Sequence, residues 1–265
     1  MCAHFPRVSR DHWLARFQRG RVLDANGIAL TVEHQHQTGM TVRYFREVDA
    51  EPLIPFDAQI IHADEDLVVV DKPHFLPVMP AGRFVKQTLL RRLMNELGNT
   101  DLVPLHRIDR ATAGLVMFSA RPESRDSYQS LFRQRAVEKH YEALAPALSG
   151  VTFPLTRQSR IVHGDPFFCM REVDGPANSE SLIDIIDRSQ RFWKYALSPI
   201  TGRKHQLRVH MAALGAGILN DRIYPELRPE IDDDFDKPLG LLARSLSFSD
   251  PISGRPRHFE SRLTL

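Results

Sequence analysis

Apolar and polar residues follow two different periods along this chain, and each period predicts a different element. Between residues 60 and 72, two apolar, β-branched runs flank the acidic residues 64–66 and end before Pro73, which predicts two strands joined by a turn. Between residues 84 and 97, apolar residues recur every three or four positions, which predicts an amphipathic helix. A second helix is predicted over residues 122–135.

The remaining apolar runs are short and predict strands, with helices placed irregularly between them. The predicted strands cover residues 115–118, 140–145, 159–163, 179–186, 193–198, 241–248 and 258–263. Because strand and helix do not alternate regularly, the pattern favours an α+β domain over a doubly wound parallel sheet. We therefore expect a mixed, mainly antiparallel central sheet flanked by helices and loops.

The first fifty residues have a different pattern from the rest. Residues 9–18 have helical spacing, and an Asn-Gly pair before a strand-like run at 28–32 predicts a hairpin, with a further strand at 40–44. The following residues, 51–57, contain two prolines that would stiffen a linker. The predicted organisation is thus an N-terminal segment 1–50, a linker 51–57 and a main domain 58–265.

The composition fits one large domain with a small appendage. The chain has 265 residues, 42% of them hydrophobic, and a formal net charge of +2. Residues 201–210 contain basic but no acidic residues, whereas residues 226–236 are mostly acidic and are expected to be a solvated loop without function. A near-neutral charge with local basic patches favours an enzyme that docks locally on a polyanion over a basic packaging protein.

Nothing in the sequence indicates secretion or insertion into a membrane. Two cysteines do not make a disulfide framework and indicate a reducing compartment. No apolar run is long enough to span a bilayer, and the N-terminus has no apolar signal core. We therefore expect a cytoplasmic protein that does not associate with membranes.

The stretch with the most unusual chemistry covers residues 106–116, His-Arg-Ile-Asp-Arg-Ala-Thr-Ala-Gly-Leu-Val. In it Asp109 lies between Arg107 and Arg110, and arginine neighbours favour the charged form of a carboxylate. An ionised, fixed carboxylate without a metal motif nearby is a candidate nucleophile. A structural ion pair at a strand edge would give the same local pattern. On a regular strand, Arg107 and Asp109 would point to the same side.

Residues 139–144 and 241–248 each contain one side chain that is either a core residue or part of a site. Alternation along the first stretch places Lys139 and Tyr141 on one face of a strand, where a tyrosine is commonly a core or rim aromatic. Leu241, taken alone, is a core leucine. The residues by themselves leave both possibilities open.

Residues 199–210 predict the end of a strand followed by the start of a helix. Arg203 and Lys204 would lie beside the helix N-terminus, where backbone N–H groups and the helix dipole favour a phosphate. A solvated basic helix start is the alternative. His205 and His210 are five residues apart and do not share a helical face, so the spacing does not predict a metal site.

Together these stretches resemble the motifs of the RluA-type RNA pseudouridine synthases. The usual active-site motif His-Arg-Leu-Asp-Arg-x-Thr-Ser-Gly-Leu differs here only by Ile108 and Ala113. Further matches are Lys-x-Tyr-x-Ala at 139–143, Thr-Gly-Arg-x-His-Gln-Ile-Arg-Val-His at 201–210, Gly-Asp-x-x-Tyr at 220–224 and Leu-His-Ala-x-x-Leu-x-Phe at 241–248. Asn220 and Leu242 depart from the last two motifs, and the resemblance extends over residues 60–248.

The resemblance implies a role for each matched side chain. Asp109 would be the catalytic residue, and Arg208 would pair with it. Tyr141 would stack on the target base and take part in the proton transfer at C5, while Leu241 would pack against the base. Arg107 would fill the space that the extruded base leaves.

The implied activity is the isomerisation of specific uridines in structured RNA, either rRNA or tRNA, to pseudouridine. The C1′–N1 bond breaks, the base rotates and C1′ joins C5, so nothing is oxidised or hydrolysed, and neither a cofactor nor a metal is expected. Asp109 is the expected nucleophile, and attack at C1′ or at C6 fits equally well. Arg203, Lys204 and His205 would contact the RNA. We expect a monomer whose partner is RNA.

Residues 1–50 resemble the second half of an S4-like RNA-binding module. The segment would be a truncated module, because the first helix of the module has no room before residue 9. A small β-rich cap packed on the main domain has the same pattern, and the two interpretations are left open.

Two other functions fit part of the sequence. A catalytically silent RNA-binding or ribosome-assembly protein could retain the same fold, although every charged catalytic position of the family is filled here. A retaining, glycosidase-like hydrolase could use Asp109. That chemistry requires a second carboxylate opposite the first, and none of the motifs supplies one.

Overall fold

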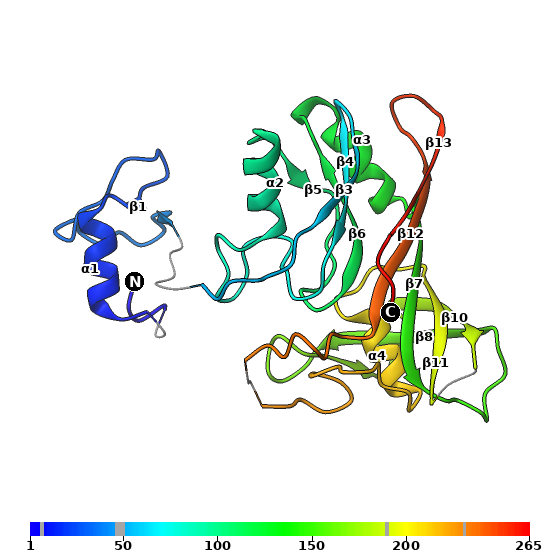
Figure 1. Cartoon of the computed structure of the whole chain (residues 1–265). Coiled ribbons are helices and arrows are strands. Elements are labelled where there is room, and N and C mark those ends of the chain that lie inside the picture. The colour runs from blue at the N-terminus through cyan, green and yellow to red at the C-terminus, as the bar shows by residue number, and fades with distance from the viewer. Residues whose placement is uncertain (6–7, 46–50, 189–190, 230–231) are drawn as a thin grey trace. The chain divides into compact units, whose positions relative to one another are not determined.

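The structure is a computed structural model that describes residues 1–5, 8–45, 51–188, 191–229 and 232–265. Its contacts divide the chain into two compact units, Met1–Ala50 and Glu51–Leu265 (Figure 1). Each unit has an apolar core of its own. Among the described residues, no helix is both long enough and apolar enough to cross a membrane.

The small unit consists of one helix and a two-stranded sheet. Helix α1, Arg10–Gln18, begins after Ser9, whose hydroxyl accepts a backbone N–H of the first turn. Strand β1, Val22–Leu23, pairs antiparallel with β2, Arg43–Tyr44. The buried residues of this core are Trp13, Val22 and Leu30. The predicted helix is confirmed.

The chain of the small unit reverses direction at the predicted Asn-Gly turn. There the carboxylate of Asp24 accepts two backbone N–H groups, which stabilises the turn. The predicted strand at 28–32 is wrong, because only one bridge forms, between Leu23 and Ala29. Strand β1 forms its ladder with β2 instead.

In the larger unit, eleven strands of the described residues form one sheet. They are β3, Gln59–Ala63; β4, Leu67–Lys72; β5, Val103–Pro104; β6, Ala113–Ser119; β7, Glu138–Pro146; β8, Leu155–His163; β9, Met170–Val173; β10, Ser179–Asp187; β11, Phe192–Pro199; β12, Leu241–Ser249; and β13, Pro256–Glu260. Their order is β3-β4-β6-β12-β7-β11-β10-β8-β9, with β5 beside β6 and β13 beside β12. The β6–β12 pair is parallel and the other pairs are antiparallel. The predicted α+β fold with a mixed, mainly antiparallel sheet is confirmed.

The described helices of the larger unit are α2, Leu89–Leu97; α3, Pro122–Arg133; and α4, Gln206–Ala213. Helix α2 begins later than the apolar spacing predicts, because Thr88 caps it and the carboxylate of Glu51 accepts the backbone N–H groups of residues 85–87. The predicted linker 51–57 therefore packs as part of the larger unit, and Ile54 is buried in its core. Strand β9 was not predicted.

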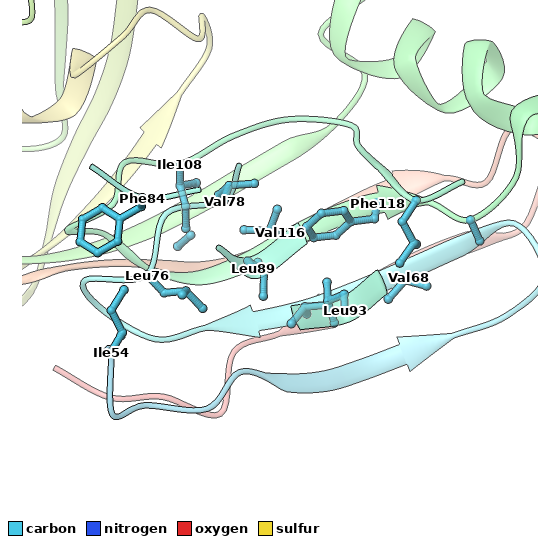
Figure 2. Close-up of a cluster of buried hydrophobic side chains, with 14 residues drawn as sticks. Ile54, Val68, Leu76, Val78, Phe84, Leu89, Leu93, Ile108, Val116 and Phe118 are labelled. Atoms are coloured by element: carbon cyan, nitrogen blue, oxygen red, sulfur yellow. The ribbon is translucent and has the colours of Figure 1, made fainter. Parts of the chain in front are cut away.

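Strands β4 and β6 are buried on both faces. Alternate residues of each strand face α2 on one side and α3 on the other. Figure 2 shows the cluster on the α2 side, which includes Val68, Leu89, Leu93, Val116 and Phe118. On the opposite side, Leu67, Val69, Leu115 and Met117 pack against residues of α3. Burial on both faces explains why the sequence of these strands is continuously apolar rather than alternating.

The close pairing of β6 with β12 depends on Gly114. This residue has a φ of +107°, and a Cβ there would lie 2.2 Å from the carbonyl oxygen of Ala243. A glycine is therefore required at this point. The pairing places the loop that precedes β6 next to the start of β12, and the candidate site lies there.

Candidate active site

A cavity of about 450 Å³ lies among the loop before β6, strands β7 and β12, and the start of α4. Of the predicted site residues, those that line it are Arg107, Asp109, Tyr141, Arg203, His205, Arg208 and Leu241. Lys204 is exposed and does not line the cavity. Four segments that are distant in sequence thus bring their predicted side chains into one cavity.

The loop that carries Asp109 is anchored to the end of β4. Lys72, whose side chain is fully buried, donates from Nζ to the carbonyl oxygen of Arg110 at 3.2 Å. His74 Nδ1 lies 2.7 Å from the carbonyl oxygen of Ala111, within hydrogen-bond distance. Burial lowers the pKa of Lys72 to about 7, although the nearby charge of Asp109 opposes this change. These two contacts fix the backbone immediately after the candidate nucleophile.

Asp109 has one hydrogen-bonded cation and one nearby imidazole. Arg208 Nη1 donates to its Oδ2 at 3.0 Å, and His205 Nε2 lies 3.7 Å from its Oδ1. Burial raises the pKa of Asp109, but the charges of Arg208 and His205 and the hydrogen bond from Arg208 outweigh it and hold the pKa below its usual value. Burial also lowers the pKa of His205 to about 4. Near neutral pH, the counter-charge of the carboxylate is therefore mainly Arg208.

Of the two arginines that flank Asp109 in sequence, Arg107 lines the same cavity as Asp109, whereas Arg110 does not. Residues 106–110 do not form a strand, so the expected alternation does not apply. Arg110 turns away from Asp109 and makes a bidentate ion pair with Asp233, at 2.7 and 2.8 Å. Arg107 lies at the rim of the cavity with an exposed side chain. The prediction that both neighbours hold the carboxylate ionised is wrong for Arg110.

The ion pair of Arg110 also corrects the expectation for the acidic segment 226–236. The side chain of Asp233 is only 9% exposed and contacts Arg83 as well as Arg110. Phe235 packs edge-on against Phe75. The segment is therefore not a wholly solvated loop, because Asp233 and Phe235 contact side chains elsewhere in the larger unit.

Arg208 is held by a second carboxylate on the side away from Asp109. Its Nε and Nη2 donate to the two oxygens of Asp221 at 2.8 and 2.7 Å, and the Asp221 side chain is fully buried. Burial lowers the pKa of Arg208, but the hydrogen bonds and charges of Asp221 and Asp109 raise it above its usual value. Arg208 is thus a permanent cation. The sequence analysis missed Asp221 as a site residue, although it lies inside the fourth motif.

Tyr141 and Leu241 come from neighbouring strands, β7 and β12, which pair antiparallel. Both line the cavity, and in the described part of the chain the Tyr141 hydroxyl makes no hydrogen bond. Burial, reinforced by the charge of Asp109, raises the pKa of Tyr141. The phenol therefore stays protonated near neutral pH.

The rim of the cavity is positively charged. It is lined by Arg133, the last residue of α3, by Arg135 just after the helix, by Lys139 of β7 and by Arg203. The main chain of Asn178 accepts a hydrogen bond from Nε of Arg203, which fixes this side chain at the rim. The rim could hold a polyanion while its reacting group enters the cavity.

Comparison with known proteins identifies the class to which this site belongs. The sequence model of a family described as RNA pseudouridylate synthase matches residues 66–213, which contain Asp109, Tyr141 and Arg208. The chain belongs to this family. The sequence-based expectation of an RNA pseudouridine synthase is confirmed at this level.

Similar proteins agree with the family assignment. An uncharacterized RNA pseudouridine synthase of Synechocystis is 29% identical over 229 residues, which are 81% of this chain and 74% of that protein. The mitochondrial tRNA pseudouridine(32) synthase of Saccharomyces cerevisiae is 28% identical over 211 residues, 75% of this chain but only 41% of that protein. The structure of human RNA pseudouridylate synthase domain containing 1 superposes with a TM-score of 0.65 at 22% identity, covering 81% of this chain and 86% of that one. This superposition shows that the fold is shared.

Proposed function

We propose that this protein isomerises specific uridines in structured RNA to pseudouridine, with Asp109 as the nucleophile. The observation that carries the proposal is the pairing of Asp109 with Arg208 in one cavity with Tyr141 and Leu241, in a chain that belongs to the RNA pseudouridylate synthase family. These side chains come from four separate segments, so chance clustering is a poor explanation.

The reaction breaks the C1′–N1 bond, turns the base and joins C1′ to C5. The hydrogen on C5 leaves as a proton, N1 gains one, and nothing is oxidised or hydrolysed. The ionised Asp109 can hold the intermediate at C1′ or at C6, and Arg208 remains charged beside it throughout. The apolar side chain of Leu241 and the ring of Tyr141 form walls against which the base can turn.

The target uridine must leave its base stack to reach Asp109. Unstacking costs a few kcal/mol, and less when the base is already unpaired. The exposed Arg107 at the rim is suited to occupy the vacated position, while Arg133, Arg135 and Arg203 would bind the flanking phosphates. Lys204, outside the cavity, would contact a phosphate further along the RNA.

The choice between tRNA and rRNA requires a direct assay. One similar protein is named a tRNA pseudouridine synthase, which supports tRNA as the first substrate to test, with rRNA beside it. Purified protein is incubated with bulk tRNA and rRNA from cells that lack this gene, and the RNA is digested to nucleosides and separated. New pseudouridine supports the proposal. Binding without new pseudouridine in either RNA would support the catalytically silent alternative.

Arg107→Lys is expected to slow isomerisation of a paired uridine at least tenfold more than that of an unpaired uridine. Lysine keeps the charge but lacks the planar guanidinium that would stack in place of the base. Single-turnover rates on paired and unpaired versions of one RNA measure the difference. Arg203→Lys is the matched control, because a phosphate contact should lose a similar factor on both RNAs. Equal losses for Arg107→Lys on the two RNAs would show that Arg107 does not take the place of the extruded base.

Deletion of residues 1–50 is expected to leave a folded, active larger unit that binds RNA more weakly. The apolar residues Trp13, Val22 and Leu30 are buried within the small unit itself, so their removal does not by itself remove the core of the larger unit. If the small unit binds RNA in the manner of an S4-like module, the salt dependence of affinity should become shallower. Melting temperature and affinity at several salt concentrations are measured. An insoluble product would instead support the cap interpretation, and an unchanged salt slope would reject RNA binding.

A further inference from the structure

The segment 220–224 contacts both side chains that approach the carboxylate of Asp109. Its Asp221 pairs with Arg208, and the hydroxyl of its Tyr224 lies 2.8 Å from Nδ1 of His205. Neither Asp221 nor Tyr224 lines the cavity, so neither is placed to touch the substrate. An effect of Asp221 or Tyr224 on the reaction is therefore expected to act through Arg208 and His205.

Asp221 fixes the direction of Arg208. Its Oδ1 accepts the backbone N–H groups of Ile223 and Tyr224, so the carboxylate is rigidly attached to its own turn. The carboxylate binds Arg208 through Nε and Nη2, and the remaining Nη1 is directed at Oδ2 of Asp109. A planar guanidinium held at two nitrogens has no freedom to turn the third elsewhere.

Tyr224 determines which nitrogen of His205 carries the proton. The hydroxyl of Tyr224 accepts the backbone N–H of Met170 at 2.7 Å, and its own hydrogen is free to donate. Among the described residues, the acceptor within reach is Nδ1 of His205. If Nδ1 carried the proton, Tyr224 would accept twice and its hydrogen would have no acceptor. The lone pair of Nε2 would then also face the negative Oδ1 of Asp109.

We propose that Asp221 and Tyr224 are positioning residues for the nucleophile, and that Tyr224 holds His205 as the neutral tautomer protonated on Nε2. Arg208 then donates a hydrogen bond to one oxygen of Asp109, and the Nε2–H of His205 points toward the other. The separation of 3.7 Å at His205 exceeds a hydrogen bond, and such contacts commonly tighten when the substrate is bound. The expected effect of Tyr224 on catalysis rests on the proposed function. The expected tautomer of His205 does not.

The tautomer can be measured without any activity. The intact protein is labelled with ¹⁵N in its histidines, and the His205 signals are identified by their absence in His205→Gln. At neutral pH we expect a protonated Nε2 and an unprotonated Nδ1 in the wild type, and a mixture of tautomers in Tyr224→Phe. A proton on Nδ1 in the wild type would overturn the proposal even if the protein makes pseudouridine.

The catalytic consequence is tested by a double-mutant cycle. Tyr224→Phe is expected to lower kcat about 10- to 100-fold, as loss of the partner that orients a metal-binding histidine does, with little change in KM. In a His205→Leu background the same change should have almost no further effect on kcat. An equal loss in both backgrounds would show that Tyr224 acts only on the fold and would reject its positioning role.

Tyr195→Phe is the matched control for loss of a buried hydroxyl. Tyr195, like Tyr224, is buried, and its hydroxyl likewise accepts a backbone N–H, from Leu148, while donating to the carbonyl oxygen of Pro146. It does not line the cavity. We expect Tyr195→Phe and Tyr224→Phe to lower the melting temperature similarly, with kcat lowered only by the second. A similar loss of kcat in both variants would contradict the proposal.

Discussion

Asp109→Asn is expected to reduce pseudouridine formation by about 10⁴-fold or more, as the loss of a catalytic nucleophile does in other enzymes. Asparagine keeps the shape of the side chain but cannot form the bond to C1′ or C6. Arg208 would retain its bidentate partner Asp221, so the buried cation would not be left unpaired. We therefore expect RNA affinity and melting temperature to change little.

The assay for Asp109→Asn measures single-turnover formation of pseudouridine, beside RNA affinity and thermal unfolding. Asp233→Asn is the matched control, because Asp233 is also a poorly exposed carboxylate that pairs with an arginine, yet it does not line the cavity. Turnover near that of the wild type in Asp109→Asn, at an unchanged melting temperature, would contradict the assignment of the nucleophile.

Arg208→Met is expected to destabilise the protein by about 3–5 kcal/mol at neutral pH, as removal of one member of a buried ion pair typically does. The substitution leaves Asp109 and the fully buried Asp221 facing each other without a cation between them. Isomerisation should also be lost. The double variant with Asp221→Asn should recover part of the stability, because one of the two uncompensated charges is then absent.

The deficit of Arg208→Met should depend on pH in a defined direction. In the wild type the pKa of Asp109 is lowered, so its contribution to stability is present at neutral pH and is lost as the pH falls through the carboxyl range. Without Arg208, burial would dominate and raise the pKa of Asp109 in the folded protein. The variant should therefore gain stability relative to the wild type as the pH falls from about 7 to about 5, which urea unfolding measures. A deficit that stays constant over this range would contradict this account of Asp109, Arg208 and Asp221.

Local sequence patterns predicted most of the larger unit because burial and pattern agree there. The apolar runs around Val69 and Val116 are strands buried on both faces, and the alternating stretch around Tyr141 is a strand with one face toward the cavity. One cavity contains a side chain from each of four motif segments, Asp109, Tyr141, Arg208 and Leu241. No spacing in the chain predicts that these side chains meet. Their resemblance to a known family supplied this information.

What local patterns missed are pairings between residues far apart in the chain. Arg110 stands beside Asp109 in sequence, yet its partner is Asp233, 123 positions away. A run of acidic residues predicts solvation because charges are usually exposed, and only the tertiary fold shows that Asp233 is nearly buried and paired with Arg110. Asp221 and Tyr224 were missed for a related reason, since they contact Arg208 and His205 rather than the substrate cavity.

The most direct test of the central claim follows the hydrogen that isomerisation must remove. An RNA that carries tritium at C5 of its uridines loses that label to water only when C5 forms a new bond to the sugar. Wild-type protein incubated with such tRNA or rRNA is expected to release tritium in proportion to the pseudouridine formed, and Asp109→Asn is expected to release none above background. Release by the variant at the wild-type rate, or no release by the wild type from either RNA, would contradict the proposed function.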